Sequence, residues 1–325
     1  MLSVLVAGAA WAGSGPWVVA QGDQYVYLGS EAQRLTKLAQ SSGSYADDVL
    51  DVGAGGPITE AGAGVSTFGV KGIVTYGLLP RAELELAVPY YRVRFNRQDD
   101  ALCTDLLGPS ACAANKGLGI VTARAKVLLL DELYGPAVSL AVGPELRHGD
   151  FTAPERGQIT NLGEGTTDLG AFASVGRTGA FGSQGAWSTF AELGYRNRLP
   201  NASITTAVNS DVGAVPGDEI WGTWESLVGS ITWGAGPTLS YYNRPQGIDF
   251  EDLLADPELA GDDERFAALR VMSLQAGAKL VVRSEERVSF SASVSRTLYA
   301  ENNPADLLTV GAGVSVRNMG RRSDN

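Results

Sequence analysis

The feature that most constrains this chain is a residue-by-residue alternation of apolar and polar side chains in its last hairpin, residues 287–317. The polar positions hold mainly Ser, Gly and Thr. Side chains of a strand alternate between its two faces, so the pattern predicts two strands that each have one apolar and one polar face. Small polar residues suit a barrel lumen better than the core of a water-soluble sandwich, and the apolar face suits lipid. We therefore predict an all-β fold, a transmembrane antiparallel β-barrel. The apolar row consists of Val288, Phe290, Ala292, Val294, Leu308, Val310, Ala312, Val314 and Val316.

Composition agrees with a membrane barrel and excludes other classes. The 325 residues are 44% hydrophobic, yet no apolar run reaches the roughly 20 residues that a membrane helix needs. The mean hydropathy is near zero, which is usual for barrels because their strands alternate. A net charge of −11 disfavours nucleic acid as a partner.

The first residues are typical of a secretory signal. Residues 1–12, MLSVLVAGAAWA, are apolar and end in an A-x-A cleavage pattern. They lack a positively charged start, which leaves two alternatives: a signal whose beginning is truncated, or an apolar tail that is not cleaved. We favour a signal peptide, which leaves residues 13–325 as a single β-barrel domain.

The alternation continues along the chain and predicts about twelve strands. Long polar connections follow the first, third, fifth, seventh and ninth strands, and short turns lie between most of the others. Outer-membrane barrels have long outer loops and short periplasmic turns, so both termini should lie in the periplasm. The predicted strands are 23–34, 59–77, 83–96, 118–130, 136–148, 166–177, 186–198, 218–229, 236–246 and 268–282, followed by the two of the last hairpin.

The third strand contains an irregularity at Pro89. Before it the apolar residues are even-numbered, but after it Tyr91, Val93 and Phe95 are apolar while Arg92 and Arg94 are polar. An uninterrupted strand would turn both arginines toward lipid, so we predict a β-bulge at Pro89–Tyr90. The alternative is that the strand ends at Pro89.

The polar faces predict a lumen that contains charges of both signs. These charges could narrow a passage, or they could fill a small barrel with salt bridges. The segment ahead of the first strand looks too short for a large plug, so residues 97–117 are the best candidate for a loop that folds inward. Phe172 and Phe190 are also predicted to face the lumen. The constriction candidates are Arg92, Arg94, Arg124, Lys126, Arg147, Glu83, Glu85, Glu145 and Glu192, with Asp168, Arg196, Arg198 and Lys279 on the same face.

The cysteine and histidine content argues against metal chemistry and catalysis. Cys103 and Cys112 could form a disulfide that stabilises their loop by roughly 3 kcal/mol, or both could be free thiols. Two Cys and one His cannot supply a four-ligand zinc site. The single His148 is followed by no recognisable nucleophile pattern, so an outer-membrane hydrolase is the least favoured function.

Two further groups of residues suggest how the barrel sits in its membrane. Trp221, Trp224 and Trp233 lie near predicted strand ends, where tryptophan favours headgroup depth. The acidic stretch 247–266 is predicted to be a solvated outer loop, and the alternative is that it binds lipopolysaccharide through a divalent ion. Outer-membrane lipid and lipopolysaccharide are therefore expected partners.

Two segments resemble a known family. Residues 22–28, GDQYVYL, and the hairpin 76–90, YGLLPRAELELAVPY, are similar to the bacterial outer-membrane barrels grouped as phenol-degradation meta-pathway transporters. The resemblance implies a Gram-negative outer-membrane barrel that passes small, often aromatic or hydrophobic molecules, without catalytic residues or a cofactor. The chain departs from many such barrels by ending in the polar residues GRRSDN rather than in an aromatic residue.

These observations predict a passive outer-membrane channel for small solutes. The resemblance implies hydrophobic or aromatic compounds, whereas closely facing basic and acidic rows would favour polar or zwitterionic ones. The alternative is a structural or adhesive barrel without a conducting pore. No enzyme activity and no cofactor are expected.

Overall fold

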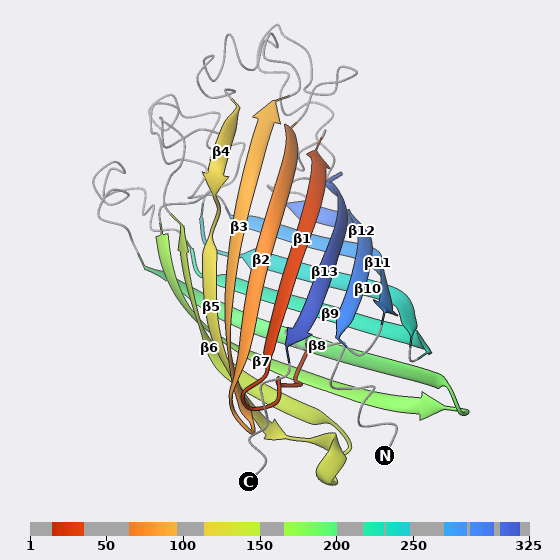
Figure 1. The fold of residues 1–325 in the computed structure, drawn as a ribbon. Helices are drawn as coiled ribbons and strands as arrows, with labels where there is room; N and C mark the ends of the chain where they lie inside the picture. Colours follow the sequence, from red (N-terminus) through yellow and green to blue (C-terminus); the bar gives the residue numbers. More distant parts are fainter. Residues whose placement is uncertain are drawn as a thin grey trace, which may run out of the picture.

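The computed structural model describes residues 15–35, 65–95, 114–149, 166–199, 217–230, 232–247, 270–284, 287–301 and 306–318. One antiparallel sheet contains every strand in these ranges (Figure 1). A 3₁₀ turn, η2, covers Glu132–Tyr134. The strands are β1 Gln24–Leu35, β2 Val65–Leu79, β3 Ala82–Phe95, β4 Asn115–Leu118, β5 Val121–Leu130, β6 Ser139–Gly149, β7 Thr166–Phe181, β8 Gly185–Leu199, β9 Glu219–Ser230, β10 Trp233–Arg244, β11 Val271–Ser284, β12 Val288–Glu301 and β13 Leu308–Asn318.

The sheet closes on itself to form a barrel. Each strand pairs with its neighbour in sequence, and β13 returns to pair with β1. Both β4 and β5 pair with β3, so they are two parts of one strand interrupted at residues 119–120. The thirteen segments therefore occupy twelve positions in the wall, which confirms the predicted fold.

The two ends of the barrel differ in their connections. Short turns join β2 to β3, β7 to β8 and β9 to β10, and β1 begins and β13 ends at this end (Figure 1). The strand ends that flank the longer connections lie at the other end. Short turns and termini mark the periplasmic side of such barrels, so we call the two ends the periplasmic end and the outer end.

The outer wall carries an apolar belt and the interior is polar. Leu28 on β1 is 54% exposed and Phe290 on β12 is 51% exposed, and both face outward. The inward positions beside Phe290 are Ser289 and Ser291, as the alternation predicts. Such a large apolar outer surface on a closed barrel is stable only in lipid. The chain is therefore an integral outer-membrane β-barrel. No helix among the described residues is long and apolar enough to span a bilayer.

The predicted bulge in β3 is wrong. The register between β2 and β3 runs without a break through Lys71–Pro89 and Val70–Tyr90. The extra residue lies instead between β4 and β5, on the other side of β3. There three residues, 119–121, stand opposite two, 88–89. Gly119 donates a backbone hydrogen bond of 3.0 Å to the Pro89 carbonyl at this point.

The position of this irregularity decides where two arginines point. Because β3 keeps its phase, Tyr91 and Val93 face inward, while Arg92 and Arg94 are exposed on the outer wall. The predicted placement of Arg92 and Arg94 in the lumen is therefore wrong. An extra residue in the neighbouring strand adapts the sheet to Pro89 without turning the side chains of β3.

Strand boundaries differ modestly from those predicted. β7 continues through the glycine-rich stretch to Phe181, so its turn is confined to residues 182–184. β10 begins at Trp233, three residues earlier than expected. The first residues of the predicted second strand, 59–64, lie outside the described residues.

The belt predicts a depth-dependent cost for charge on the outer wall. Leu28→Arg, near the middle of β1, should lower the free energy of unfolding by about 2–4 kcal/mol, whereas an arginine near the interface costs about 0–1 kcal/mol. Leu199→Arg, at the outer end of β8 and opposite Thr167, is the matched control. Urea unfolding in phospholipid vesicles measures both, and equal losses would contradict the assigned membrane position.

Candidate functional site

The interior of the barrel is the candidate site, and its two walls differ in chemistry. Most of the inward charged side chains come from β5 to β10. The facing wall, from β11 through β13 to β1, presents mainly small polar residues, among them Ser273, Ser289, Ser293 and Ser315. Of the sequence-predicted candidates, those on the inner face are Glu83, Glu85, Arg124, Lys126, Glu145, Arg147 and Glu192.

Glu219 on β9 is the centre of the ion-pair cluster nearest the outer end. Its carboxylate is 2.9 Å from Arg147, 3.1 Å from Arg244 and 3.3 Å from Arg196. The Tyr242 hydroxyl donates a further hydrogen bond of 2.6 Å to it. The residue is 1% exposed, so these donors replace the water that a carboxylate needs. Sequence reasoning missed Glu219 because the phase of its strand was uncertain.

Arg124 on β5 is the centre of a second cluster, nearer the middle of the barrel. Its guanidinium lies 2.6 Å from Glu192 and 3.2 Å from Glu145, and Arg196 also pairs with Glu145. The Arg124 guanidinium stacks 3.8 Å from the centre of the Phe172 ring. Carboxylates and an aromatic face together fix this side chain within the lumen.

Trp221 corrects one prediction about the aromatic residues. Its ring faces inward, with Arg196 4.8 Å and Arg124 5.3 Å from its centre. It is therefore part of the lumen and not an interfacial residue. Trp224 on the same strand faces outward, and its indole donates to the Thr189 hydroxyl at 3.2 Å.

The segment before β1 enters the lumen at the periplasmic end. We call residues 15–20 the N-terminal plug. Lys126 donates hydrogen bonds to the carbonyls of Gly15 at 3.0 Å and Trp17 at 2.9 Å, and it pairs with Glu83 at 2.7 Å. Glu83 in turn accepts a 2.6 Å hydrogen bond from the Val19 backbone amide. The inward pair Lys126–Glu83 therefore binds the plug through backbone groups.

Trp17 anchors the plug across the barrel. Its side chain is 8% exposed and packs with Phe190, Leu227 and Val281 from β8, β9 and β11. Its ring meets that of Phe190 edge to face, with centroids 6.2 Å apart. The indole nitrogen donates to Glu132 at 3.3 Å. The plug thus contacts several walls of the barrel.

The segment is not a large plug, but it lies in the lumen, so the expectation that only inward charges or a folded-in loop narrow the barrel is wrong. The inward side chains already narrow the periplasmic end, so a few residues fill the space that remains. Pro16 is among the largest fully buried residues, which shows how tightly the segment fits. The sequence gives no direct signal for this because the fit depends on the shape of the assembled lumen.

A cavity lies above the plug, between the charged wall and the serine-rich wall. Its volume is about 400 Å³. Gly15 of the plug and Phe190 border it, so the plug bounds the cavity. Its polar lining includes Glu192, Glu225, Lys279, Thr238, Ser240, Gln275, Ser291, Ser293 and Ser295.

His148 forms no catalytic constellation with other described residues. His148 is exposed at the outer end of β6, and its Nδ1 lies 2.9 Å from the Thr167 hydroxyl. No described carboxylate contacts it, so the orienting group of a catalytic triad is missing there. In the described part of the chain no three His, Cys, Asp or Glu side chains are placed to hold a metal. Cys103, Cys112, most of the loop 97–117 and all of the acidic stretch 247–266 except Gly247 lie outside the described residues, so the disulfide stays a prediction.

Comparisons with known proteins place the fold among outer-membrane barrels. No protein-family model matches the sequence, and no curated protein matches it, so the resemblance to phenol-degradation transporters stays a prediction. The structure is similar to the COG4313 outer membrane channel of Pseudomonas putida F1, with a TM-score of 0.60, 12% identity and coverage of 93% of this chain and 98% of that one.

Two other solved structures are less similar. The β-domain of the Bordetella autotransporter BrkA gives a TM-score of 0.43 at 12% identity, covering 91% of this chain and 99% of that one. The KdgM porin gives 0.41 at 7% identity, covering 90% and 98%. These identities are low, so the likeness to the COG4313 channel concerns the fold alone.

The cluster around Glu219 predicts an unequal response to neutralising substitutions. Glu219→Gln leaves several buried arginines without their shared carboxylate, so the free energy of unfolding should fall by about 3–5 kcal/mol. Glu301→Gln is the control, because Glu301 is partly exposed and 3.8 Å from Arg270, a geometry worth about 0–1 kcal/mol. Urea unfolding in vesicles should separate the two variants, and similar losses would show that the cluster adds little stability.

Proposed function

We propose that this protein is a passive outer-membrane channel for small polar solutes and that the N-terminal plug closes its periplasmic mouth. The observation that carries the proposal is the polar cavity above the plug, whose lower boundary includes Gly15. A barrel that served only as a scaffold would have no need of solvent-sized space lined by charges and hydroxyls. Removing the plug would extend this cavity toward the periplasm.

The plug has the attachment expected of a movable closure. It joins β1 through Gly22, which has a φ of 82° and donates a backbone hydrogen bond to Gly77. The contacts that hold it are those of Lys126, Glu83 and Glu132 and the packing of Trp17. The plug is not a strand of the sheet, so it can leave the lumen without breaking the barrel.

The lining favours polar solutes over the aromatic or hydrophobic ones that the family resemblance implies. Lys279 on β11 pairs with Glu225 on β9 at 2.9 Å, and in the register it stands beside Ser293 of β12. Charges of both signs therefore lie among the hydroxyls of the cavity, and such a lining favours small dipolar or zwitterionic molecules.

The first test removes the anchor of the plug. Trp17→Ala deletes the side chain that packs against Phe190, Leu227 and Val281, so single-channel conductance in planar bilayers should rise severalfold above that of the wild type. Trp233→Ala is the matched control, because it removes a tryptophan that is 48% exposed on the outer wall of β10 and does not line the cavity, so conductance should stay unchanged.

Two outcomes would decide against the N-terminal plug as the closure of the channel. Equal conductance of wild type and Trp17→Ala would mean that the plug does not limit flow. The double variant Glu83→Gln with Lys126→Met also releases the plug. If it conducts no better than the wild type, and liposomes that contain it take up no small solute, the lumen is closed by its ion pairs. The second candidate function is a structural barrel without a pore, and the observation that supports it is the dense ion pairing around Glu219 and Arg124.

The cavity charges predict the ion selectivity of the opened channel. In the Trp17→Ala background, Lys279→Gln removes the cation from the passage and should shift the reversal potential in a salt gradient toward cation selectivity. Arg177→Gln changes an exposed charge on the outer wall of β7 and should leave selectivity unchanged. Identical reversal potentials for the two would show that solutes do not pass Lys279.

A further inference from the structure

We propose that the outer wall of β1 to β4 carries a binding site for a phosphorylated glycolipid of the outer leaflet. The site is the outer basic patch, defined as Arg34, Arg92, Arg94 and Lys116. This inference depends on the membrane position of the barrel and is independent of whether the lumen conducts.

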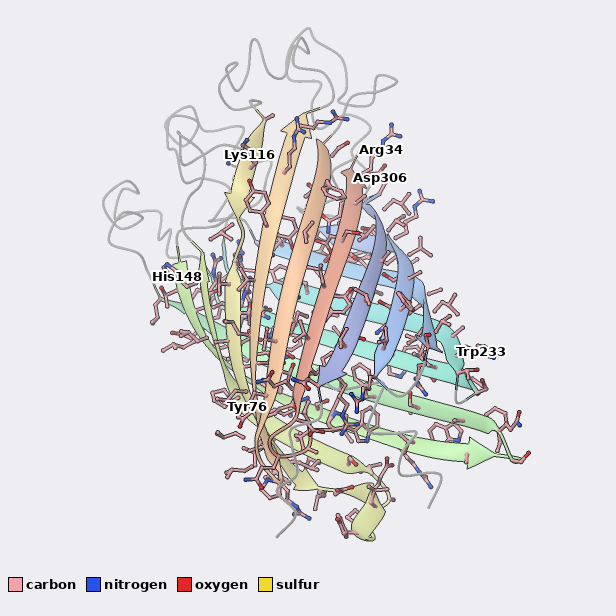
Figure 2. The ribbon with its side chains drawn as sticks, in the orientation of Figure 1. Arg34, Tyr76, Lys116, His148, Trp233 and Asp306 are labelled. Carbon is pink, nitrogen blue, oxygen red and sulfur yellow. The ribbon has the colours of Figure 1, made fainter. Side chains whose placement is uncertain are left out.

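The strand registers bring the four side chains together. Arg34 and Arg94 both stand opposite Ser66, on either side of β2. Arg92 stands opposite Lys116 on its other side. All four are exposed and face outward, and Figure 2 shows Arg34 and Lys116 near the same end of the wall. The patch therefore spans four neighbouring segments of the barrel at its outer end.

The patch begins where the apolar belt ends. Phe68 stands opposite Arg92, and Ala32 stands opposite Phe68. One outward position closer to the periplasm, Tyr90 and Val70 are exposed and belong to the belt. Arginine is costly at the bilayer midplane and cheap at the interface. The four cations therefore lie at headgroup depth, where lipid phosphates are found.

The charges of the patch are uncompensated within the described residues. Neither the three arginines nor Lys116 forms an ion pair with a carboxylate in this part of the chain, whereas the inward arginines Arg124, Arg147 and Arg196 all do. Like charges directly opposite each other in a sheet are unfavourable, and Arg92 faces Lys116 in this way. In a protein with a net charge of −11, this gathering of like charges suits an anionic ligand.

A groove on the same surface indicates that the ligand is amphipathic. Its volume is about 450 Å³, and its outward-facing lining combines Arg34, Arg92 and Arg94 with Phe68 and Val310. Guanidinium groups bind phosphate by paired hydrogen bonds, and the apolar side chains offer a surface for an acyl chain. Free phosphate could use only the first of these features, so we assign the site to a lipid phosphate with its chain along the belt.

The test compares two triple variants of equal charge. Arg34→Gln, Arg92→Gln and Arg94→Gln together remove most of the patch. Arg81→Gln, Arg177→Gln and Arg287→Gln remove three exposed arginines at the periplasmic end. Native mass spectrometry of the detergent-solubilised full chain measures the retention of purified bisphosphorylated lipid A, with monophosphorylated lipid A and inorganic phosphate as comparison probes.

The wild type and the periplasmic triple should bind bisphosphorylated lipid A with similar affinity, and the patch triple should bind it on the order of 100-fold more weakly, since each basic residue near an anionic surface contributes about one tenfold step or slightly less. Monophosphorylated lipid A should bind less tightly, and millimolar inorganic phosphate should not displace the lipid. Replacing the three patch arginines by lysine retains the charge and should keep most of the binding. Such a result would show that the glutamine triple loses affinity because it loses charge and not because it misfolds.

The proposal is overturned if both glutamine triples lose affinity equally, or if the patch triple folds and binds like the wild type. Displacement by inorganic phosphate alone would instead identify a simple anion site and would also overturn the assignment to lipid.

Discussion

The pairing of β1 with β13 is the interaction on which the rest of this structure depends. Within lipid an unpaired backbone group costs several kcal/mol, so a membrane sheet has to close. Eleven register pairs from Gln24–Asn318 to Arg34–Leu308 form this seam. At its periplasmic end Asp23 accepts hydrogen bonds of 2.7 and 3.2 Å from Arg317. This contact holds the seam beside the point where the chain turns into the lumen as the plug, so closure of the wall and placement of the plug are coupled.

Closure also determines what the interior can contain. Twelve strands enclose more space than an eight-stranded barrel, which side chains can fill, and less than an open porin. The chain uses this space unevenly, with long charged side chains on one wall and serines and glycines on the other. Carboxylates such as Glu219 and Glu145 each receive two or more cationic donors. A buried charge is tolerated only with such partners, so each of these residues fixes the positions of the others. The space that remains lies along the serine wall.

The sequence predicted the features that depend on local alternation and missed those that depend on neighbours. The phases of β5, β6, β7 and β8 could be read directly, which is why Arg124, Arg147 and Glu192 were correctly expected on the inner face. At Pro89 the same reasoning failed, because the extra residue that adapts the sheet lies in the next strand, near Gly119. The direction of Trp221 and the fit of Trp17 were not predictable for a related reason. Both depend on the arginines and apolar side chains that other strands bring to them.

The arginines of β3 and β6 show why the phase of a strand matters more to function than its composition. Arg147 faces inward and contacts Asp168 and Glu219, so its charge is compensated by carboxylates of the lumen wall. Arg92 and Arg94 have the same chemistry but face outward above Phe68, where no described carboxylate pairs with them. A shift of one residue in β3 would exchange these environments: it would place two more cations in the lumen and leave the outer rim without them. The uninterrupted register of β3 therefore keeps two groups of charges apart, since the internal ones line the lumen while those at the rim face the membrane.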